Sequence, residues 1–419
     1  MGRHITRSLT LVITLFVTSA SADDWTRFRG PGGMGVSNEK GLPYKWSSGE
    51  NIAWKRKLPG PGASSPITWA DHVFVTCYTG YGLKADEGDQ KVLRRHVLRL
   101  RRKDGEITWH KQLEPKLPEH QYRGEGAYHG YAASTPTCDG KRLYVFFGKS
   151  GVYCFDLDGN ELWDADVGTG TNGWGSGTSP VLYGKLLLVN ASVESGSLVA
   201  LDTITGNERW RVSGIRDAWN TPLVVDGPKG VAEVVVSIQN RLLAFHPESG
   251  KELWNADGVH RYVCPSVVSH DNVVYAIGGG HTSLAVRAGG RGDVTKTQGL
   301  WRQKRGSNVS SPIYHDGHLY WAKAGIVTCQ DAATGKTVFQ RRLDPTPSRF
   351  WSSPVLADGK LYFVSQHNGT YVVAATPKLE QLAHNVFEDD KSRTNASPAA
   401  SNGQLFLRTD HALYCIGKK

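Results

Sequence analysis

The architecture of this 419-residue chain can be read most directly from the segment Ala200-Leu201-Asp202-Thr203-Ile204-Thr205-Gly206-Asn207-Glu208-Arg209-Trp210. It has the form Ala-x-Asp-x-x-x-Gly-x-x-x-Trp, in which a strand runs into a glycine turn and an aromatic residue follows. Variants of this phrase recur at Ala244–Trp254, at Cys329–Phe339 and, one residue shorter, at Cys154–Trp163. A phrase that repeats along a chain indicates a repeat architecture, whereas the length alone would suggest two or three domains.

A second phrase, made of a small polar residue, a proline and an apolar pair, recurs ahead of the first. Its prolines are Pro66, Pro136, Pro180, Pro222, Pro265, Pro312, Pro354 and Pro398. Successive prolines are 70, 44, 42, 43, 47, 42 and 44 residues apart, so six of the seven intervals are nearly equal. Each interval holds hairpin turns such as Asp139-Gly140 and β-rich runs such as Leu186–Asn190. Four strands in about 43 residues is the size of one β-propeller blade.

The strand count predicts how the ring closes. Eight proline strands are present, but only seven outer strands follow them before the chain stops soon after Tyr414. The segment Asn51–Lys55 can supply the eighth, because Trp54 precedes Pro66 by the same 12 residues as in a central repeat. We therefore predict an all-β protein, an eight-bladed β-propeller of four-stranded antiparallel blades closed by the N-terminal strand. The repeat aromatics are expected to end the outermost strands and to pack between neighbouring blades.

The first 22 residues have the pattern of a secretory signal peptide. Arg3 and Arg7 precede an apolar run from Leu9 to Ala20, and small residues suited to cleavage continue to Ala22. The run is about a dozen residues long, which is too short for a transmembrane helix. We expect a signal peptide at 1–22, an N-terminal extension at 23–50, a propeller at 51–419, and export to the periplasm or the cell exterior.

The chain is basic. Its formal net charge is +10, and the value falls to +8 if Arg3 and Arg7 leave with the signal peptide. An exported basic protein can meet anionic lipid, cell-wall polymer or acidic polysaccharide. Nucleic acid is not an expected partner, because that compartment holds little of it. No cysteine follows the expected cleavage site, so a lipid anchor is not expected.

The Ala-x-Asp-x-x-x-Gly-x-x-x-Trp repeat resembles the tryptophan-docking repeat of the pyrroloquinoline quinone (PQQ) propeller superfamily, over residues from about 50 to 419. That superfamily includes quinoprotein alcohol dehydrogenases and BamB-type subunits of the outer-membrane β-barrel assembly machinery. The chain is also similar to secreted bacterial PQQ-binding-like β-propeller repeat proteins in Trp25–Pro31, Phe147–Gly151 and Gly289–Thr295. The resemblance implies the fold, whereas activities diverge within the superfamily.

The resemblance also defines what an enzyme of this superfamily would need. Such an enzyme would carry a catalytic Asp. It would also carry Glu and Asn side chains that bind calcium, a Trp under the quinone ring and typically a vicinal Cys pair. This chain has no adjacent cysteines, and Asn172, Trp174, Glu194 and Asp217 do not assemble into a calcium site in the sequence. Common hydrolase and nucleotide-binding signatures are missing as well. We therefore expect no catalytic residue, metal or cofactor, with PQQ plus calcium as the alternative.

The six cysteines are read mainly as packing residues. Three of them occupy the first position of the repeat in different blades: Cys154, Cys329 and Cys415. Equivalent positions in different blades lie too far apart for a disulfide, which needs Cα atoms within about 7 Å. We expect these three to be small buried fillers, and a bond among Cys77, Cys138 and Cys264 is left open.

A basic run, Arg94–Lys103, lies on the third strand of the first blade. Arg99 and Arg101 fill the Ala and Asp positions of the repeat there. One interpretation is an outer, solvated strand. The other is a basic patch or a buried Arg pair that faces Asp389 and Asp390.

Rigid scaffolds commonly present function on loops. In a propeller, the connections that enter the innermost strands ring one mouth of the central channel, and here they are rich in aromatics, Arg and Asn. We predict a ligand-binding site there, formed by His129, Tyr131, Trp174, Arg216, Trp219, Arg261, Tyr262, Asn308, Arg349, Trp351, Arg393 and Asn395. The alternative is that these side chains cap the channel and pack the loops together.

The long first interval predicts two insertions in the first blade. Residues 113–133 could fold over the channel mouth as a lid, and the Gly-rich residues 78–90 are expected on the opposite side of the blade. Loops of this length are usually functional or disordered.

Together these observations favour an exported, monomeric, non-catalytic binding or scaffold propeller. Its channel mouth would contact a peptide, a glycan or a small ligand. A PQQ-dependent quinoprotein dehydrogenase is the first alternative, and a BamB-like outer-membrane protein assembly factor is the second.

Overall fold

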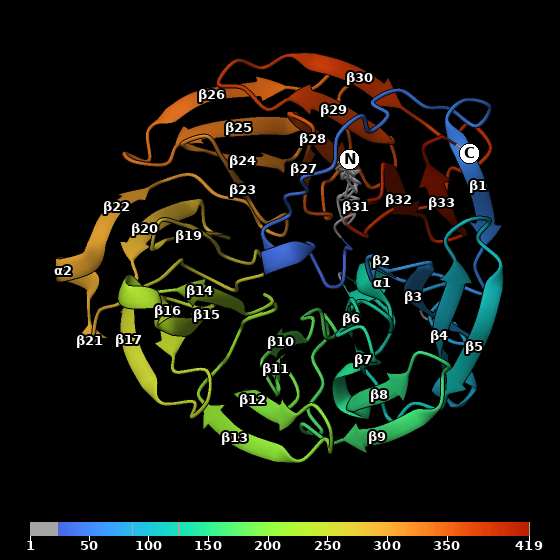
Figure 1. The fold of residues 1–419 in the computed structure, drawn as a ribbon, viewed down its shortest axis with the longest axis horizontal. Coiled ribbons are helices and arrows are strands. Elements are labelled where there is room, and N and C mark those ends of the chain that lie inside the picture. Colours follow the sequence, from blue (N-terminus) through green and yellow to red (C-terminus); the bar gives the residue numbers. More distant parts are fainter. Residues whose placement is uncertain (1–23, 86, 125, 419) are drawn as a thin grey trace, which may run out of the picture.

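The computed structural model describes residues 24–85, 87–124 and 126–418, and these residues form eight sheets around a central axis (Figure 1). Each sheet is one blade, and the blades follow one another around the ring in chain order. The predicted eight-bladed β-propeller is therefore confirmed. The predicted signal peptide, residues 1–22, lies outside the described residues. Within the described part, no helix has the length and apolar character that a membrane crossing requires.

The first four blades contain the following strands, from the channel outward. Blade 1 has β2 (Ile67–Trp69), β3 (His72–Thr79), β4 (Arg94–Arg101) and β5 (Ile107–Leu113). Blade 2 has β6 (Thr137–Cys138), β7 (Arg142–Phe146), β8 (Val152–Asp156) and β9 (Glu161–Ala165). Blade 3 has β10 (Val181–Tyr183), β11 (Leu186–Ala191), β12 (Ser197–Asp202) and β13 (Glu208–Ser213). Blade 4 has β14 (Leu223–Asp226), β15 (Ala232–Ile238), β16 (Arg241–Phe245) and β17 (Glu252–Asp257).

The remaining blades repeat this order. Blade 5 has β18 (Val268–His270), β19 (Val273–Gly278), β20 (Thr282–Arg287) and β22 (Gly299–Gln303). Blade 6 has β23 (Ile313–His315), β24 (His318–Lys323), β25 (Ile326–Asp331) and β26 (Thr337–Arg342). Blade 7 has β27 (Val355–Ala357), β28 (Lys360–Val364), β29 (Thr370–Ala374) and β30 (Gln381–Asn385). Blade 8 has β31 (Ala399–Ser401), β32 (Gln404–Arg408), β33 (Ala412–Ile416) and β1 (Ile52–Lys57).

Helical segments are single turns. Four of them are 3-10 turns: η1 (Pro31–Gly33), η2 (Gln90–Val92), η3 (Gly148–Ser150) and η4 (Pro228–Gly230). Two are α-helical turns: α1 (Gly126–His129) and α2 (Thr295–Gln298).

The N-terminal strand closes the ring as predicted. The antiparallel pair of β1 with β33 places Trp54 opposite Cys415 and Lys55 opposite Tyr414. Blade 8 is thus assembled from both ends of the propeller, and β33 has hydrogen-bonded neighbours on both sides. A ring closed in this way cannot open without breaking a strand pair.

The repeat glycine and tryptophan dock five of the eight blades on the next one. A Cβ on Gly250 would lie 2.6 Å from the indole of Trp210, and the φ of this glycine is +68°, so only glycine fits the turn. The Trp210 Nε1–H donates to the Pro247 carbonyl at 2.9 Å in the same turn of blade 4. The same contact joins Trp54 to Gly105, Trp109 to Gly159, Trp163 to Gly206 and Trp301 to Gly335. Packing between blades is confirmed, but the aromatic does not end its strand, because Trp210 is the third residue of β13.

Blades 4 and 5 dock differently, because blade 5 lacks the repeat glycine turn. There the chain from Ala288 to Gln298 bulges outward, and β21 (Gly292–Asp293) pairs in parallel with β17 as a fifth strand of blade 4. Trp254 is fully buried and donates its Nε1–H to a carboxylate oxygen of Glu233 at 2.7 Å. The Gly289 amide donates to the same oxygen at 3.2 Å. A buried carboxylate therefore replaces the carbonyl that receives the indole N–H elsewhere.

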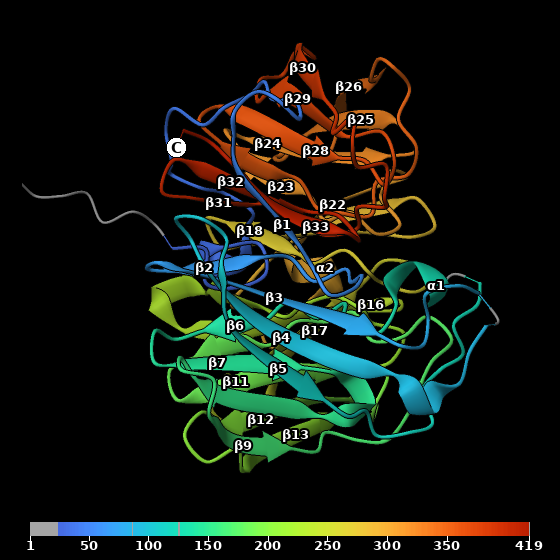
Figure 2. The ribbon, with the colours of Figure 1, turned by 90° about the vertical axis from the view of Figure 1, so that its right-hand side faces the viewer.

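The chain before β1 crosses one opening of the channel. Trp25 and Thr26 accept backbone hydrogen bonds from the inner strands of blades 1 and 2, and Val36 forms a bridge with Leu356 of blade 7. We call residues 24–36 the N-terminal segment, and it runs over the centre of the ring in Figure 1. We call this side the far face and the opposite side, where α1 lies, the mouth face; Figure 2 shows the two features on opposite sides of the ring.

The basic run on β4 separates into buried and exposed residues. The buried ones are Arg95 and Arg102, whose carboxylate partners are Glu119 at 2.6 Å and Asp24 at 2.9 Å. The prediction that Asp389 and Asp390 answer a buried pair is wrong, because Asp389 binds Lys55 and Asp390 binds Tyr414 and Thr409. Arg95 is the second residue of β4, whereas Arg102 follows the end of this strand, and both side chains are buried where a carboxylate lies within reach.

Candidate functional site

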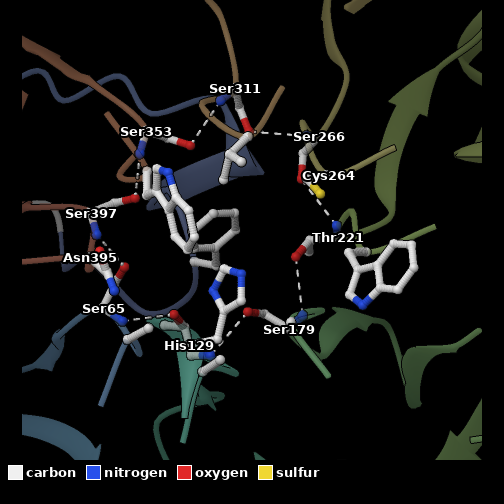
Figure 3. A pocket seen from close by; sticks show the side chains of 18 of the residues that line it. Ser65, His129, Ser179, Thr221, Cys264, Ser266, Ser311, Ser353, Asn395 and Ser397 are labelled. Carbon is white, nitrogen blue, oxygen red and sulfur yellow. Dashed lines mark hydrogen bonds between the residues drawn. The ribbon is translucent and has the colours of Figure 1, made fainter. Parts of the chain in front are cut away.

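A ring of hydroxyl groups encircles the channel (Figure 3). The backbone N–H of one residue in each blade donates to the hydroxyl of its equivalent in the next blade, with N···O distances of 2.8 to 3.1 Å. The eight members are Ser65, Thr135, Ser179, Thr221, Ser266, Ser311, Ser353 and Ser397. This ring explains the small polar residue of the proline phrase, because the hydroxyl caps an amide that no strand partner reaches.

Blade 5 departs from the expected register of that phrase. Cys264 precedes the proline where the other blades have serine or threonine, but the ring member is Ser266, one residue after Pro265. Cys264 still lines the channel, where burial raises the pKa of its thiol to about 12. The residue before the proline therefore does not identify the ring member in this blade.

The channel is narrow, and aromatic residues of both faces line it. A cavity of about 90 Å³ lies within it, and Phe28 of the N-terminal segment lines it together with His129 and Trp351 of the mouth. The His129 and Trp351 rings stack at 4.7 Å between centroids with an interplanar angle of 27°. These two residues come from the connections that enter blades 2 and 7. A cavity of about 90 Å³ is too small for a ligand of ordinary size, which must therefore bind at a face.

A larger hollow opens on the mouth face beside this stack, with a volume of about 440 Å³. We call it the mouth hollow, and it is lined by His129, Trp174, Tyr262, Ser307, Asn308, Val309, Lys323, Ala324, Arg349, Phe350 and Trp351. Trp174 contacts Tyr262 at 4.7 Å and Trp219 at 5.9 Å between ring centroids, so its indole is held on two sides. The volume lies within the range of small-molecule pockets.

The charges around the mouth hollow are of one sign. Among the described residues, its lining contains Lys323 and Arg349 and no carboxylate. Burial lowers the pKa of Lys323 below its ordinary value. Burial, with Arg393 nearby, lowers the pKa of His129 to about 4, so the imidazole is neutral at pH 7 and serves as a stacking ring. An occupant that carries negative charge and a flat or apolar group would match this lining.

The twelve predicted site residues divide into three groups. Those that line the mouth hollow are His129, Trp174, Tyr262, Asn308, Arg349 and Trp351. Two others, Trp219 and Asn395, line the channel below. The remaining four line neither cavity: Tyr131, Arg216, Arg261 and Arg393.

Two of these four are structural. Tyr131 is buried at 4% exposure and donates its hydroxyl to the His120 carbonyl at 2.7 Å. Arg393 binds Asp410 at 2.9 Å and donates to the Ala127 carbonyl at 3.0 Å, so it ties α1 to blade 8. Arg216 and Arg261 are exposed on the mouth face.

Sequence reasoning overlooked Lys323, Phe350 and Phe28. Lys323 stands at the hairpin between β24 and β25 rather than in a connection between blades. Successive strands of a blade run in opposite directions, so this hairpin and the connections between blades reach the same face. That alternation could have identified Lys323. Nothing in the sequence places Phe28 in the channel, because the N-terminal segment is held there only by contacts with distant blades.

The insertion 113–133 packs down onto blades 1 to 3. Its Glu119 forms the buried ion pair with Arg95, and the Glu119 amide donates to the Gln90 side chain at 2.8 Å. Tyr122 donates its amide to the Tyr81 hydroxyl at 3.2 Å. The expected separation of the two insertions is thus wrong: residues 78–90 and 113–133 are packed together, since the hairpin between β3 and β4 also opens on the mouth face.

A buried carboxylate lies next to this insertion. Glu194 is 5% exposed, and the Ser176 hydroxyl donates to its carboxylate. Burial raises the pKa of Glu194 to about 7, and the charge of Glu119 adds to the rise while Arg95 opposes it. Two carboxylates and one guanidinium thus share a water-poor site beneath the mouth face, and a proton on Glu194 balances the charge near neutral pH.

The residues of the mouth do not fit a calcium-bound quinone. Calcium takes six to eight oxygen ligands, usually with carboxylates among them. No cluster of three or more His, Cys, Asp or Glu side chains that could hold a metal occurs in the described parts of the chain. Of the four candidates, Glu194 is buried against Ser176, and Asn172 accepts the Trp174 amide within its own loop at 2.9 Å.

The six cysteines, all in the described part, are unpaired. Cys154, Cys329 and Cys415 are buried, as predicted for the fillers of the repeat. Burial raises the pKa of the Cys154 thiol to about 12, which leaves it protonated and unreactive at neutral pH.

Comparison with known proteins places this geometry in a family. The sequence profile described as "Outer membrane protein assembly factor BamB" matches residues 125–291 and 291–418. The chain is 26% identical to outer membrane protein assembly factor BamB of Burkholderia pseudomallei (strain K96243), over 56% of this chain and 71% of that protein.

Solved structures show the same architecture. BamB from Moraxella catarrhalis superposes with a TM-score of 0.60 at 13% identity, over 87% of this chain and 96% of that chain. Quinohemoprotein alcohol dehydrogenase from Comamonas testosteroni superposes with a TM-score of 0.68 at 10% identity, over 95% of this chain and 81% of that one. Similarity at such low identity concerns the fold alone, so the site must be argued from its own residues.

Proposed function

The chain belongs to the family described as outer membrane protein assembly factor BamB, and from this premise we propose that it is an exported, non-catalytic binding propeller whose mouth face docks a partner. The single observation that carries the proposal is the mouth hollow, an aromatic cavity of about 440 Å³ beside the narrow channel. A rigid ring with convergent aromatic and polar side chains on one face suits recognition.

Binding rather than turnover is favoured by the chemistry of the lining. The imidazole of His129 stacks on Trp351, and its low pKa makes it a poor base at neutral pH. No carboxylate among the described residues reaches the hollow to act as an acid or a nucleophile. Addition of PQQ and calcium to the purified protein, followed by a dye-linked alcohol oxidation assay, tests the enzymatic alternative; bound quinone with turnover would overturn the proposal.

Site-specific photocrosslinking in cells tests where the partner docks. A photoreactive phenylalanine analogue replaces Tyr262 in the mouth hollow, and in the control it replaces Tyr44, which is 41% exposed beside Lys360 on the far face. We expect a discrete crosslinked product at position 262 and none at position 44. Equal labelling at both positions, or none at 262, would contradict docking at the mouth.

A role like that of the BamB relatives is the second candidate, and the family match over residues 125–418 favours it. In that case the product crosslinked through position 262 contains a protein of the outer-membrane barrel assembly machinery. Identification of that product by mass spectrometry decides between an assembly factor and a propeller with another envelope partner.

A further inference from the structure

One arc of the mouth face carries an excess of positive charge. It follows the connections that enter blades 4, 5 and 6 and continues into the wall of the mouth hollow. Its members are Arg216, Arg261, Lys304, Arg305 and Lys323, which we call the basic arc. The three connections, residues 214–222, 258–265 and 304–311, contain one acidic residue, Asp217.

The basic arc is available for a partner. Its four connection residues are exposed, and among the described residues none of the five arc side chains takes part in an ion pair. Elsewhere the cations of the molecule commonly meet acids, as Arg211 does with Glu208 at 2.6 Å and Lys55 with Asp389 at 2.7 Å. Unpaired like charges that lie close together raise the potential of the surface and attract an oppositely charged ligand.

The basic arc borders an apolar pocket. Beside Lys323 the mouth hollow is walled by Ala324, Val309 and Phe350, with Trp174 and Tyr262 on the other side. A hollow of about 440 Å³ accommodates a large side chain together with its backbone, and such an anchor in an aromatic pocket commonly dominates the energy of an interface. Apolar pocket and cationic rim are therefore adjacent parts of one surface.

Resting on the proposed function, we propose that this surface binds an acidic polypeptide segment that inserts one aromatic or aliphatic side chain into the mouth hollow while its carboxylates face the basic arc. The segment lies across the connections of blades 4 to 6, from Arg216 toward Lys323. The fully buried ion pairs below the mouth, such as Arg95 with Glu119, are already satisfied and contribute nothing to this contact.

A peptide fits better than the two other anionic partners of the cell envelope. A sugar ring presents hydroxyl groups on every edge, and the part of the lining formed by the side chains of Val309, Ala324 and Phe350 offers them no hydrogen bonds. Insertion into a lipid surface requires exposed apolar side chains, and the three arc connections contain none of the large exposed hydrophobic residues of the described chain.

Fluorescence anisotropy with the full-length protein tests the inference. The probe is a labelled pentapeptide, Asp-Glu-Phe-Asp-Glu, and its matched controls are Asp-Glu-Ala-Asp-Glu and Asn-Gln-Phe-Asn-Gln. The test variant is the double substitution Arg261→Glu and Lys304→Glu on the basic arc. The control variant is Lys185→Glu and Lys336→Glu on the far face, which changes the net charge by the same amount. Both lysines of the control pair are exposed. Titrations at about 50 and about 300 mM salt test whether the attraction is electrostatic, because salt screens exposed charges and should weaken such binding.

We expect the Phe peptide to bind wild type and the far-face variant alike, and the arc variant at least about tenfold more weakly at low salt. The Ala and the amide peptides should each lose affinity by a similar factor. Equal binding of the amide peptide, equal loss in both variants, or binding of heparin or phosphatidylglycerol vesicles in place of the peptide would overturn the inference. If crosslinking through position 262 survives in the arc variant undiminished, the acidic partner is wrong and the proposed function stands.

Discussion

Glu194→Gln is expected to stabilise the protein above neutral pH and to leave it unchanged in acid. The wild-type carboxyl group is buried with Ser176, and its pKa is raised from 4.5 to about 7. A group whose pKa is raised by folding contributes stability that is complete below its unfolded pKa and is lost as pH rises through its folded pKa. A shift of this size is worth about 3 kcal/mol, lost between about pH 4.5 and pH 7. Glutamine keeps the neutral shape and has no proton to lose.

Urea unfolding at a series of pH values measures this effect. The unfolding free energy of Glu194→Gln should exceed that of wild type by about 1 kcal/mol at pH 5 and by about 3 kcal/mol at pH 8. The control is Glu248→Gln in an exposed far-face turn, which should stay within about 0.5 kcal/mol of wild type at every pH. A difference that does not change with pH, or one of opposite sign, would show that Glu194 is charged in the folded protein and that the site beneath the mouth is wetter than described.

Three other substitutions test separate parts of the structure. Trp54→Ala removes the indole that covers Gly105 and donates to the Arg102 carbonyl at 2.7 Å. Thermal or urea unfolding should show that the free energy of unfolding falls by about 3–5 kcal/mol. A fall below about 1 kcal/mol would mean that blade 8 does not dock on blade 1. Ser353→Ala should lower the free energy of unfolding by about 1–2 kcal/mol, because it leaves the Ser311 amide of the ring without an acceptor. Ser353→Thr should keep the wild-type stability, since two members of the ring are already threonine. Equal destabilisation by both substitutions would point to packing instead. Glu119→Gln leaves the buried Arg95 without its carboxylate and should lower the free energy of unfolding by about 3–5 kcal/mol. Limited proteolysis should then cleave residues 113–133 faster than in wild type. An unchanged cleavage rate would show that the ion pair does not hold the insertion.

The ring could be predicted from the sequence because its determinants are local and repeated. A blade is built from neighbouring strands, so the glycine turn before Trp210 and the hydroxyl before seven of the eight prolines recur at nearly constant intervals. Even the closure by β1 followed from local spacing, since Trp54 precedes Pro66 by 12 residues, as Trp210 precedes Pro222. One exception is blade 5, where the chain from Ala288 to Gln298 replaces the repeat turn, adds a fifth strand to blade 4 and places the Gly289 amide on the buried Glu233 of that blade.

The site was harder to predict because its shape depends on contacts between distant blades. The sequence placed His129 and Trp351 at the mouth, but their stacking joins blades 2 and 7 and has no signal in either segment. Tyr131 and Arg393 were expected at the surface and instead hold the insertion 113–133 in place. Phe28 enters the channel through a segment that contains no repeat at all. Residue type alone identified the aromatic and cationic side chains as candidates for the site. Only the fold distinguishes the side chains that line a cavity from those that pack the loops together.

The mouth face depends on the ring that β1 closes, because it exists only if all eight blades are held at one radius. Hydrogen–deuterium exchange of residues 412–416 measures this closure directly, since the β33 amides that face outward are covered only when β1 is paired with them. We predict that this segment exchanges as slowly as the central strands β28 and β29 of blade 7, through global unfolding. Rapid exchange of 412–416 while blade 7 stays protected would contradict a closed eight-bladed ring.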